Sequence, residues 1–163
     1  MKYHNLVEQA EKMVVEQAEP ALVDALTNVF SDAFVFYFKA HSFHWNVTGK
    51  DFPQYHEFLG EVYEGVFNNM DRLAEQIRAL NAPAPMSLAS LIASSRIMEN
   101  KDPLSAMEMI AVLEDDNTKI LAGLLATQKM ADAANEVGLS NFLQDLFDQH
   151  KKFGWMFNSI LKG

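Results

Sequence analysis

The sequence has no cysteine, and it has only 7 glycines and 5 prolines among 163 residues. A chain without cysteine forms no disulfide, builds no thiolate metal site and offers no thiol to an oxidant. Because 49% of the residues are hydrophobic and 21% are charged, a disordered or fibrous chain is excluded, and the few helix breakers favour helices. The length predicts a single domain.

Positive charge is also scarce, with 13 Lys and Arg residues against 22 Asp and Glu residues and a net charge of −9. This balance argues against a large basic surface for nucleic acid and favours cations as ligands. The N-terminus lacks the apolar core of a secretory signal, and we expect no apolar run long enough to span a membrane. A cytoplasmic protein without a membrane partner is expected.

Apolar residues recur at helical spacing in four long stretches. A proline or a capping residue marks the expected start of each stretch. The four helices are predicted at 20–45, 51–80, 102–133 and 140–160, after a polar segment at about 1–18. The connection between the second and third helices is long enough to hold a short helix of its own, at 87–93. The pattern predicts an all-α, antiparallel four-helix bundle of the ferritin-like kind.

Two histidines and two carboxylates are candidate metal ligands. His44 lies near the end of the first predicted helix and His56 near the start of the second, so the intervening turn brings their rings together. Asp71 and Glu75, four residues apart on the second helix, project from one face. Imidazole and carboxylate groups together suit iron, manganese or zinc.

The spacing of these residues predicts a site shared by two chains. His56 and Asp71 are fifteen residues apart on one helix, or about 22 Å, so one chain does not wrap all four ligands around one ion. No Glu-x-x-His occurs, which argues against an inward-facing di-iron oxygenase or true ferritin centre. A two-fold dimer with antiparallel second helices uses all four ligands, and Tyr63, Phe67 and Ala74 would line its interface. By themselves, the residues also fit a capping or solvent-facing histidine and a solvated acid pair.

A longer pattern carries a family resemblance. The run His44-Trp45-Asn46-Val47-x-Gly49-x-x-Phe52-x-x-x-His56-Glu57, followed by Tyr63 and by Asp71-x-x-Ala74-Glu75-x-Ile77, resembles the signature of the Dps mini-ferritins, the DNA-binding proteins from starved cells. The short helix in the middle connection and Trp155-Met156 extend the similarity more weakly. The resemblance implies one Dps-type domain over residues 1–163.

The resemblance also implies a function. Ferrous iron held by His44 and His56 of one subunit and by Asp71 and Glu75 of its partner would be oxidised by hydrogen peroxide in preference to dioxygen. The ferric mineral would be stored in a hollow dodecamer of two-fold dimers, protecting against oxidative damage. Zinc or manganese would be substitutes for iron. Trp45 would pass an electron or quench a radical, with a bulky interface residue as the alternative.

The chain departs from the family pattern near the second histidine. Gly60 stands where family members often carry an Asp that contributes to metal binding, so a second iron site would be weaker or would use Glu57 or water. His41 lies three residues before His44 and would assist at the site or remain a simple surface histidine.

DNA binding, the other family trait, is not expected at neutral pH. Terminal basic residues are limited to Lys2, Lys12 and Lys162, and the net negative charge repels phosphates. This argues against the alternative function, a nucleoid-compacting structural protein with a weak or inactive metal site. Three acids near the start of the last helix are candidates for an acidic pore, with ordinary solvated acids as the alternative: Asp132, Glu136 and Asp145.

Overall fold

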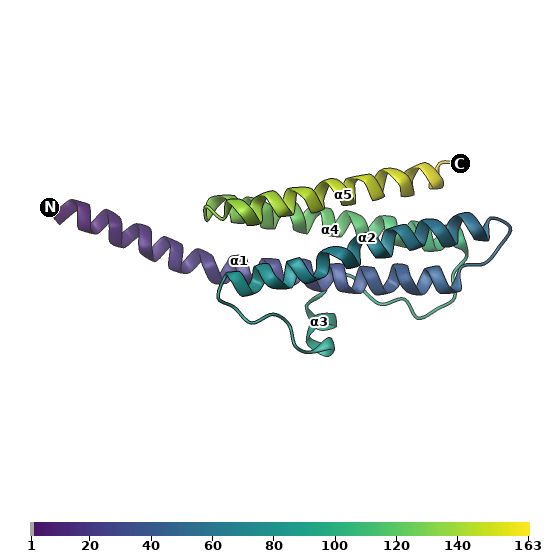
Figure 1. The fold of residues 1–163 in the computed structure, drawn as a ribbon, viewed down its shortest axis with the longest axis horizontal. Helices are drawn as coiled ribbons and strands as arrows, with labels where there is room; N and C mark the ends of the chain where they lie inside the picture. Colours follow the sequence, from purple (N-terminus) through teal and green to yellow (C-terminus); the bar gives the residue numbers. More distant parts are fainter. Residues whose placement is uncertain (1) are drawn as a thin grey trace.

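The computed structural model describes the backbone of residues 2–163 and the side chains of residues 5–9 and 20–163. Four long helices lie side by side, and a short helix lies in the connection between the second and third of them (Figure 1). The helices are α1 (Lys2–Asn46), α2 (Phe52–Ala79), α3 (Leu88–Ser94), α4 (Ala106–Ala133) and α5 (Val137–Leu161). The prediction of an all-α four-helix bundle with a short extra helix is confirmed.

The core lies between the apolar faces of the four long helices. Each fully buried Leu, Ile or Phe side chain contributes about 1.5–3 kcal/mol to stability, so these faces hold the bundle together. Pairs of fully buried side chains come from every long helix: Leu26 and Phe36 on α1, Leu59 and Ile77 on α2, Ile110 and Leu113 on α4, and Leu143 and Phe157 on α5.

Helix α1 begins earlier than the sequence predicts, because Pro20 lies inside the helix and does not start it. Proline has a backbone φ angle that suits a helix, although at an interior position it removes one backbone hydrogen bond and its ring crowds the carbonyl of the residue four positions earlier. The polar segment predicted at 1–18 is therefore helical from Lys2 onward. The side chains of residues 10–19 are outside the described part.

Two other predicted helix starts are also wrong. Helix α4 begins at Ala106, after a capping box in which Glu108 accepts a hydrogen bond from the Ser105 backbone N–H at 2.8 Å, and not at Asp102-Pro103. Helix α5 begins at Val137, so Gly138 and Ser140 lie inside it. The turn before α5 uses Asn135 at φ 59°, a left-handed conformation that asparagine tolerates.

The Pro20–Asn46 part of α1 is long and apolar enough to cross a membrane, which corrects the expectation that no such run exists. Its apolar face is nevertheless occupied by the protein core, where α1 packs against α2 and α4. Two buried ionic side chains on this helix, Asp32 and Lys39, pair with Arg96 and Asp116. These contacts are typical of the central helix of a bundle.

Arg96 ties the segment after α3 to two helices. The buried Asp32 carboxylate accepts hydrogen bonds from the Arg96 backbone N–H at 2.7 Å, from Arg96 Nε at 2.8 Å and from Ser95 Oγ at 3.0 Å. The guanidinium also lies directly over Gly123 of α4, where a Cβ atom would be 2.1 Å from Arg96 Nη2. A methyl group at position 123 would force the guanidinium to shift from this position.

We predict that Gly123→Ala lowers the free energy of unfolding by about 1–3 kcal/mol, because the added methyl displaces Arg96 from a buried carboxylate. The matched control is Gly138→Ala, where an added Cβ would meet nothing within 4 Å. That variant should be unchanged or more stable by up to about 1 kcal/mol. Urea unfolding followed by circular dichroism measures both; equal stabilities of the two variants would contradict the prediction.

His150 is a buried, neutral histidine in α5. Its ring Nδ1 donates to Asn117 Oδ1 at 2.7 Å, and the Asn117 side chain donates back to the His150 carbonyl at 2.9 Å. Burial lowers the pKa of His150 to about 4, from an ordinary value of 6.5. The folded protein therefore binds this proton only at a pH at which the unfolded chain already carries it.

The pKa difference predicts a loss of stability in acid. Above pH 6.5 the free energy of unfolding is not reduced by protonation of His150. It decreases as the pH falls from 6.5 toward 4, because the unfolded state binds the proton first. Between about pH 7 and about pH 5, the wild type should lose about 2 kcal/mol more stability than His150→Gln does. Urea titrations of both proteins at the two pH values test this, and equal pH slopes would contradict it.

Candidate metal centre

The turn between α1 and α2 brings His44 and His56 together, as the sequence predicts. The two rings are stacked with their centroids 3.7 Å apart and an interplanar angle of 21°. His44 Nδ1 donates to the His56 carbonyl at 2.6 Å, and His56 Nδ1 donates to the His44 carbonyl at 2.9 Å. These two bonds place the proton of each neutral ring on Nδ1, so each Nε2 keeps a lone pair for a metal ion.

Local contacts of the turn hold the histidines in place. The backbone N–H of Val47, a buried residue, bonds to the Phe43 carbonyl at 2.8 Å and closes the last turn of α1. Gly49 adopts a φ of 119°, which residues with a side chain rarely adopt. Asp51 occupies the N-cap position of α2, but its side chain makes no capping hydrogen bond. Phe52 stacks on the His56 ring at 5.0 Å.

Gly60 provides the space in which the His44 ring packs on α2. A Cβ atom at this position would lie 3.4 Å from His44 Cε1 and 3.5 Å from its Nδ1. A longer side chain, including the Asp expected from the family pattern, would therefore stand against the His44 ring. Glu57, which the sequence offers as a replacement ligand, is exposed one turn before Gly60.

His41 belongs to an aromatic cluster and is not a simple surface histidine. Its half-buried ring stacks on Tyr63 at 3.8 Å and lies 4.2 Å from the Trp45 ring and 6.1 Å from the His44 ring. The pKa of His41 is lowered, first by burial and then by the nearby His44 ring, while Glu64 acts in the opposite direction.

Asp71 and Glu75 lie exposed on α2, one turn apart and far from the histidines. Because α2 is one continuous helix, the rise from His56 to Asp71 is about 22 Å. Within the described residues, one chain gathers no group of three or more His, Asp or Glu side chains that could hold a metal ion. The four candidate ligands thus form two separate pairs.

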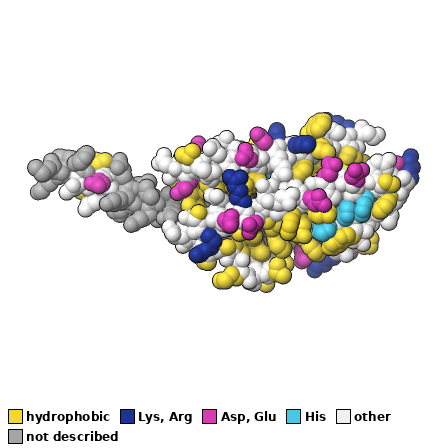
Figure 2. Space-filling view, in the orientation of Figure 1, with side chains coloured by type: hydrophobic (Ala, Val, Ile, Leu, Met, Phe, Trp, Pro, Cys, Tyr) yellow, Lys and Arg dark blue, Asp and Glu magenta, His cyan; other side chains and the backbone are white. Residues whose placement is uncertain are grey.

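Exposed aromatic side chains surround the histidine pair. Phe38 lies against Trp45 with ring centroids 6.5 Å apart, and Tyr37 lies 5.2 Å from Phe67. Figure 2 shows histidine side chains at the surface beside a patch of hydrophobic side chains. Trp45, Phe67 and Phe38 are each at least half exposed, at 58%, 56% and 50%. Aromatic residues exposed in this way are typical of interfaces between proteins.

Sequence reasoning missed part of this site. The spacing of Tyr37, Phe38, His41 and Trp45 along α1 is the signal that could have identified the aromatic cluster. The candidate pore acids are exposed around the α4–α5 turn and along α5, and Asp132 accepts a hydrogen bond from Ser140 Oγ at 3.0 Å. A pore role stays a prediction.

The packing at Gly60 yields a prediction about metal binding. Gly60→Leu should push the His44 ring out of its hydrogen bond to the His56 carbonyl and weaken ferrous iron binding about tenfold or more. Gly60→Ala, which adds a single methyl group near ordinary contact distance, is the matched control and should bind iron like the wild type. Anaerobic calorimetry with Fe²⁺ measures both affinities. Wild-type affinity in the leucine variant would show that Gly60 does not position His44.

Comparison with known proteins identifies the family of this chain. The family model described as a ferritin-like domain matches residues 23–163. The crystal structure of antigen TpF1 from Treponema pallidum is 29% identical, has a TM-score of 0.87 and covers 90% of this chain and 95% of its own. A Dps protein from Vibrio cholerae O1, described as a member of a broad superfamily of ferritin-like diiron-carboxylate proteins, is 27% identical with a TM-score of 0.85, covering 89% and 91% of the two chains.

A third relative gives the same result. The DNA protection during starvation protein of Brevibacillus brevis is 29% identical over 128 residues, which cover 78% of this chain and 86% of the relative. The chain therefore belongs to the Dps family of the ferritin-like superfamily.

Proposed function

We propose that this protein oxidises ferrous iron at sites shared by two subunits and stores the ferric product in a hollow dodecamer. Membership of the family supports iron storage or DNA protection in general terms. The observation that carries the finer proposal is the stacked pair of His44 and His56, whose hydrogen bonds reserve both Nε2 atoms for a metal ion. Imidazole nitrogen is a suitable ligand for ferrous iron.

A partner subunit completes the proposed site. In a two-fold dimer with antiparallel α2 helices, the carboxylate end of one chain meets the histidine end of the other. Asp71 and Glu75 then add oxygen ligands, which favour the ferric product. The exposed Phe38, Trp45 and Phe67 support this arrangement, because dimer formation would remove their rings from water.

Two ferrous ions in such a site would supply the electrons that peroxide needs. Each ion gives one electron, and hydrogen peroxide takes both electrons and two protons to form two waters, so no hydroxyl radical is released. Dioxygen is the slower oxidant in this proposal. In this proposal Trp45, adjacent to His44 and 4.2 Å from the His41 ring, passes an electron from iron or quenches a radical, with a bulky interface residue as the alternative role. Zinc or manganese would compete for the same ligands.

DNA compaction is the weaker candidate function. With a net charge of −9 per subunit and few basic residues near either end, the assembly would repel phosphates at neutral pH. We expect no gel shift of duplex DNA at low salt and neutral pH. We propose that the protein oxidises and stores iron in the cytoplasm.

Single substitutions test the ligands. His56→Ala or Asp71→Ala should reduce peroxide-dependent ferrous oxidation at least a hundredfold, because each removes a ligand from every site. Glu61→Ala is the matched control, an exposed acid on α2 that points about 100° away from Gly60 around the helix. Stopped-flow absorbance follows the oxidation, and size-exclusion chromatography confirms assembly. Wild-type rates in both ligand variants would refute the proposal.

Mixed assemblies test whether the site is shared. Chains carrying His44→Ala and His56→Ala are refolded with an equal amount of chains carrying Asp71→Ala and Glu75→Ala. Each mixed dimer regains one intact site, so random mixing should restore about a quarter of the wild-type sites. Each variant alone stays inactive. Failure to recover activity in verified mixed dimers would show that the two pairs do not act together.

A further inference from the structure

A chain of aromatic rings leads away from the histidine pair along the surface shared by α1 and α2. The Tyr63 ring meets the His44 ring in a T-shaped contact, with the two centroids 5.2 Å apart. Tyr37 is the next ring, 6.3 Å from Tyr63 and 5.7 Å from His41. Neighbouring rings therefore connect a proposed iron ligand to Tyr37.

Tyr37 has a proton acceptor beside its hydroxyl group. The hydroxyl oxygen lies 3.4 Å from His41 Nδ1, and both side chains are half-buried. The pKa of His41 is lowered, first by burial, so the ring is neutral at pH 7. A neutral ring with its own proton on Nε2 accepts the phenol proton on Nδ1. Because an oxidised phenol is a strong acid, such an acceptor makes Tyr37 easier to oxidise by one electron.

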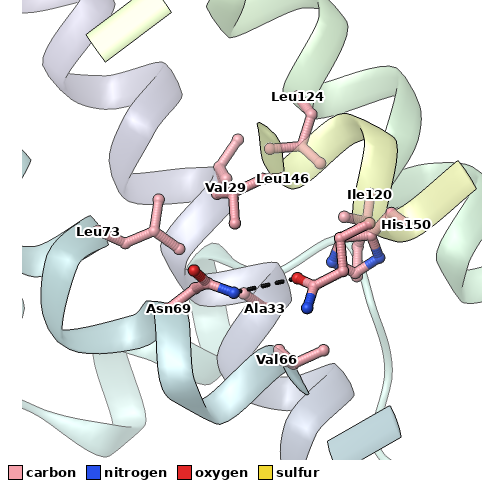
Figure 3. A pocket seen from close by; sticks show the side chains of 10 residues that line it. Val29, Ala33, Val66, Asn69, Leu73, Ile120, Leu124, Leu146 and His150 are labelled. Carbon is pink, nitrogen blue, oxygen red and sulfur yellow. Dashed lines mark hydrogen bonds between the residues drawn. The ribbon is translucent and has the colours of Figure 1, made fainter. Parts of the chain in front are cut away.

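Other groups that could give an electron are less suited to the task. The chain has no cysteine thiol. The Tyr63 hydroxyl bonds to the exposed Glu64 at 3.4 Å, and the pKa of Tyr63 is raised, first by burial and then by this carboxylate. Trp45 is 58% exposed, so a radical on it would be open to solvent. The small cavity inside the bundle is lined by aliphatic side chains, two amides and His150, without tyrosine or tryptophan (Figure 3).

A site that holds a single ferrous ion creates the need for an electron donor; this step rests on the proposed function. Gly60 places no carboxylate beside the His44 ring, so the second ion has one ligand fewer and singly loaded sites are expected when iron is scarce. One ferrous ion gives one electron, and peroxide that takes only one electron splits into hydroxide and a hydroxyl radical.

We propose that Tyr37 supplies the second electron to peroxide at a site holding one ferrous ion, while His41 takes the phenol proton. Fe²⁺ becomes Fe³⁺ and Tyr37 becomes a neutral phenoxyl radical. Hydrogen peroxide takes both electrons and two protons from solvent to form two waters. The electron passes through the Tyr63 ring to the iron site. A later ferrous ion returns an electron to the radical, and His41 returns the proton.

Freeze-quench electron paramagnetic resonance tests the proposal on the assembled protein. The protein is loaded anaerobically with one Fe²⁺ per site and mixed with one equivalent of hydrogen peroxide. The wild type should give a radical whose hyperfine splitting changes when its tyrosines are ring-deuterated, which distinguishes a tyrosine from Trp45. Tyr37→Phe and His41→Phe should each lower the radical yield about tenfold or more, because they remove the phenol and its proton acceptor.

The matched control is Tyr55→Phe. The Tyr55 hydroxyl bonds to Met107 Sδ at 3.4 Å, not to a histidine, so this variant should keep the wild-type radical yield. A spin trap for hydroxyl radical gives a second readout. Tyr37→Phe should release more hydroxyl radical than the wild type at one Fe²⁺ per site and the same amount at two, a dependence on iron loading that a purely structural role would not produce.

The outcomes separate this inference from the proposed function. Iron oxidation without a tyrosyl radical in the wild type, or an undiminished radical in folded Tyr37→Phe, would overturn the inference and leave iron oxidation standing. Absence of iron oxidation in the wild type would overturn both. If Tyr37→Phe does not fold, coupling of the wild-type radical to ¹⁵N-labelled histidine identifies Tyr37 through its bond to His41, and absence of this coupling overturns the inference.

Discussion

The two hydrogen bonds that His44 and His56 exchange across the α1–α2 turn govern the chemistry of this surface. Each ring is held by the other residue's carbonyl, so the path of the backbone also fixes the direction of the two Nε2 atoms, which we propose bind the metal. Phe52 on one side and Gly60 beneath the His44 ring complete the support. The residues around the pair thus position it through backbone and packing contacts.

The straightness of α2 fixes the distance between the histidine pair and the acid pair. A continuous helix from Phe52 to Ala79 holds histidines and acids at opposite ends of the same surface, and no side-chain movement closes a gap of about 22 Å. Between the two ends lie the aromatic rings of Tyr63 and Phe67, in contact with Tyr37 of α1. The helix therefore carries both halves of the proposed ligand set, with the aromatic rings proposed for the dimer interface between them.

Features with local causes could be predicted from the sequence. The apolar stripe of α2 and the approach of His44 to His56 follow from helical spacing and one short turn. Pro20 was misleading, because a proline that can begin a helix can also lie within one. The capping box at Ser105 and Glu108 is visible in the sequence and marks the start of α4 better than the nearby proline does.

Other features depend on partners distant in sequence. Asp32 and Arg96 are separated by 64 residues, and Lys39 and Asp116 by 77, so periodicity does not pair them. The same holds for the stacking of His41 on Tyr63, which requires the packed hairpin.

The division of the ligands along α2 has a further consequence under the proposed function. A freshly synthesised chain is inert toward iron until it meets a second copy, so oxidation begins only where a cage is forming to receive the product, and dilution below the dimer dissociation constant switches it off.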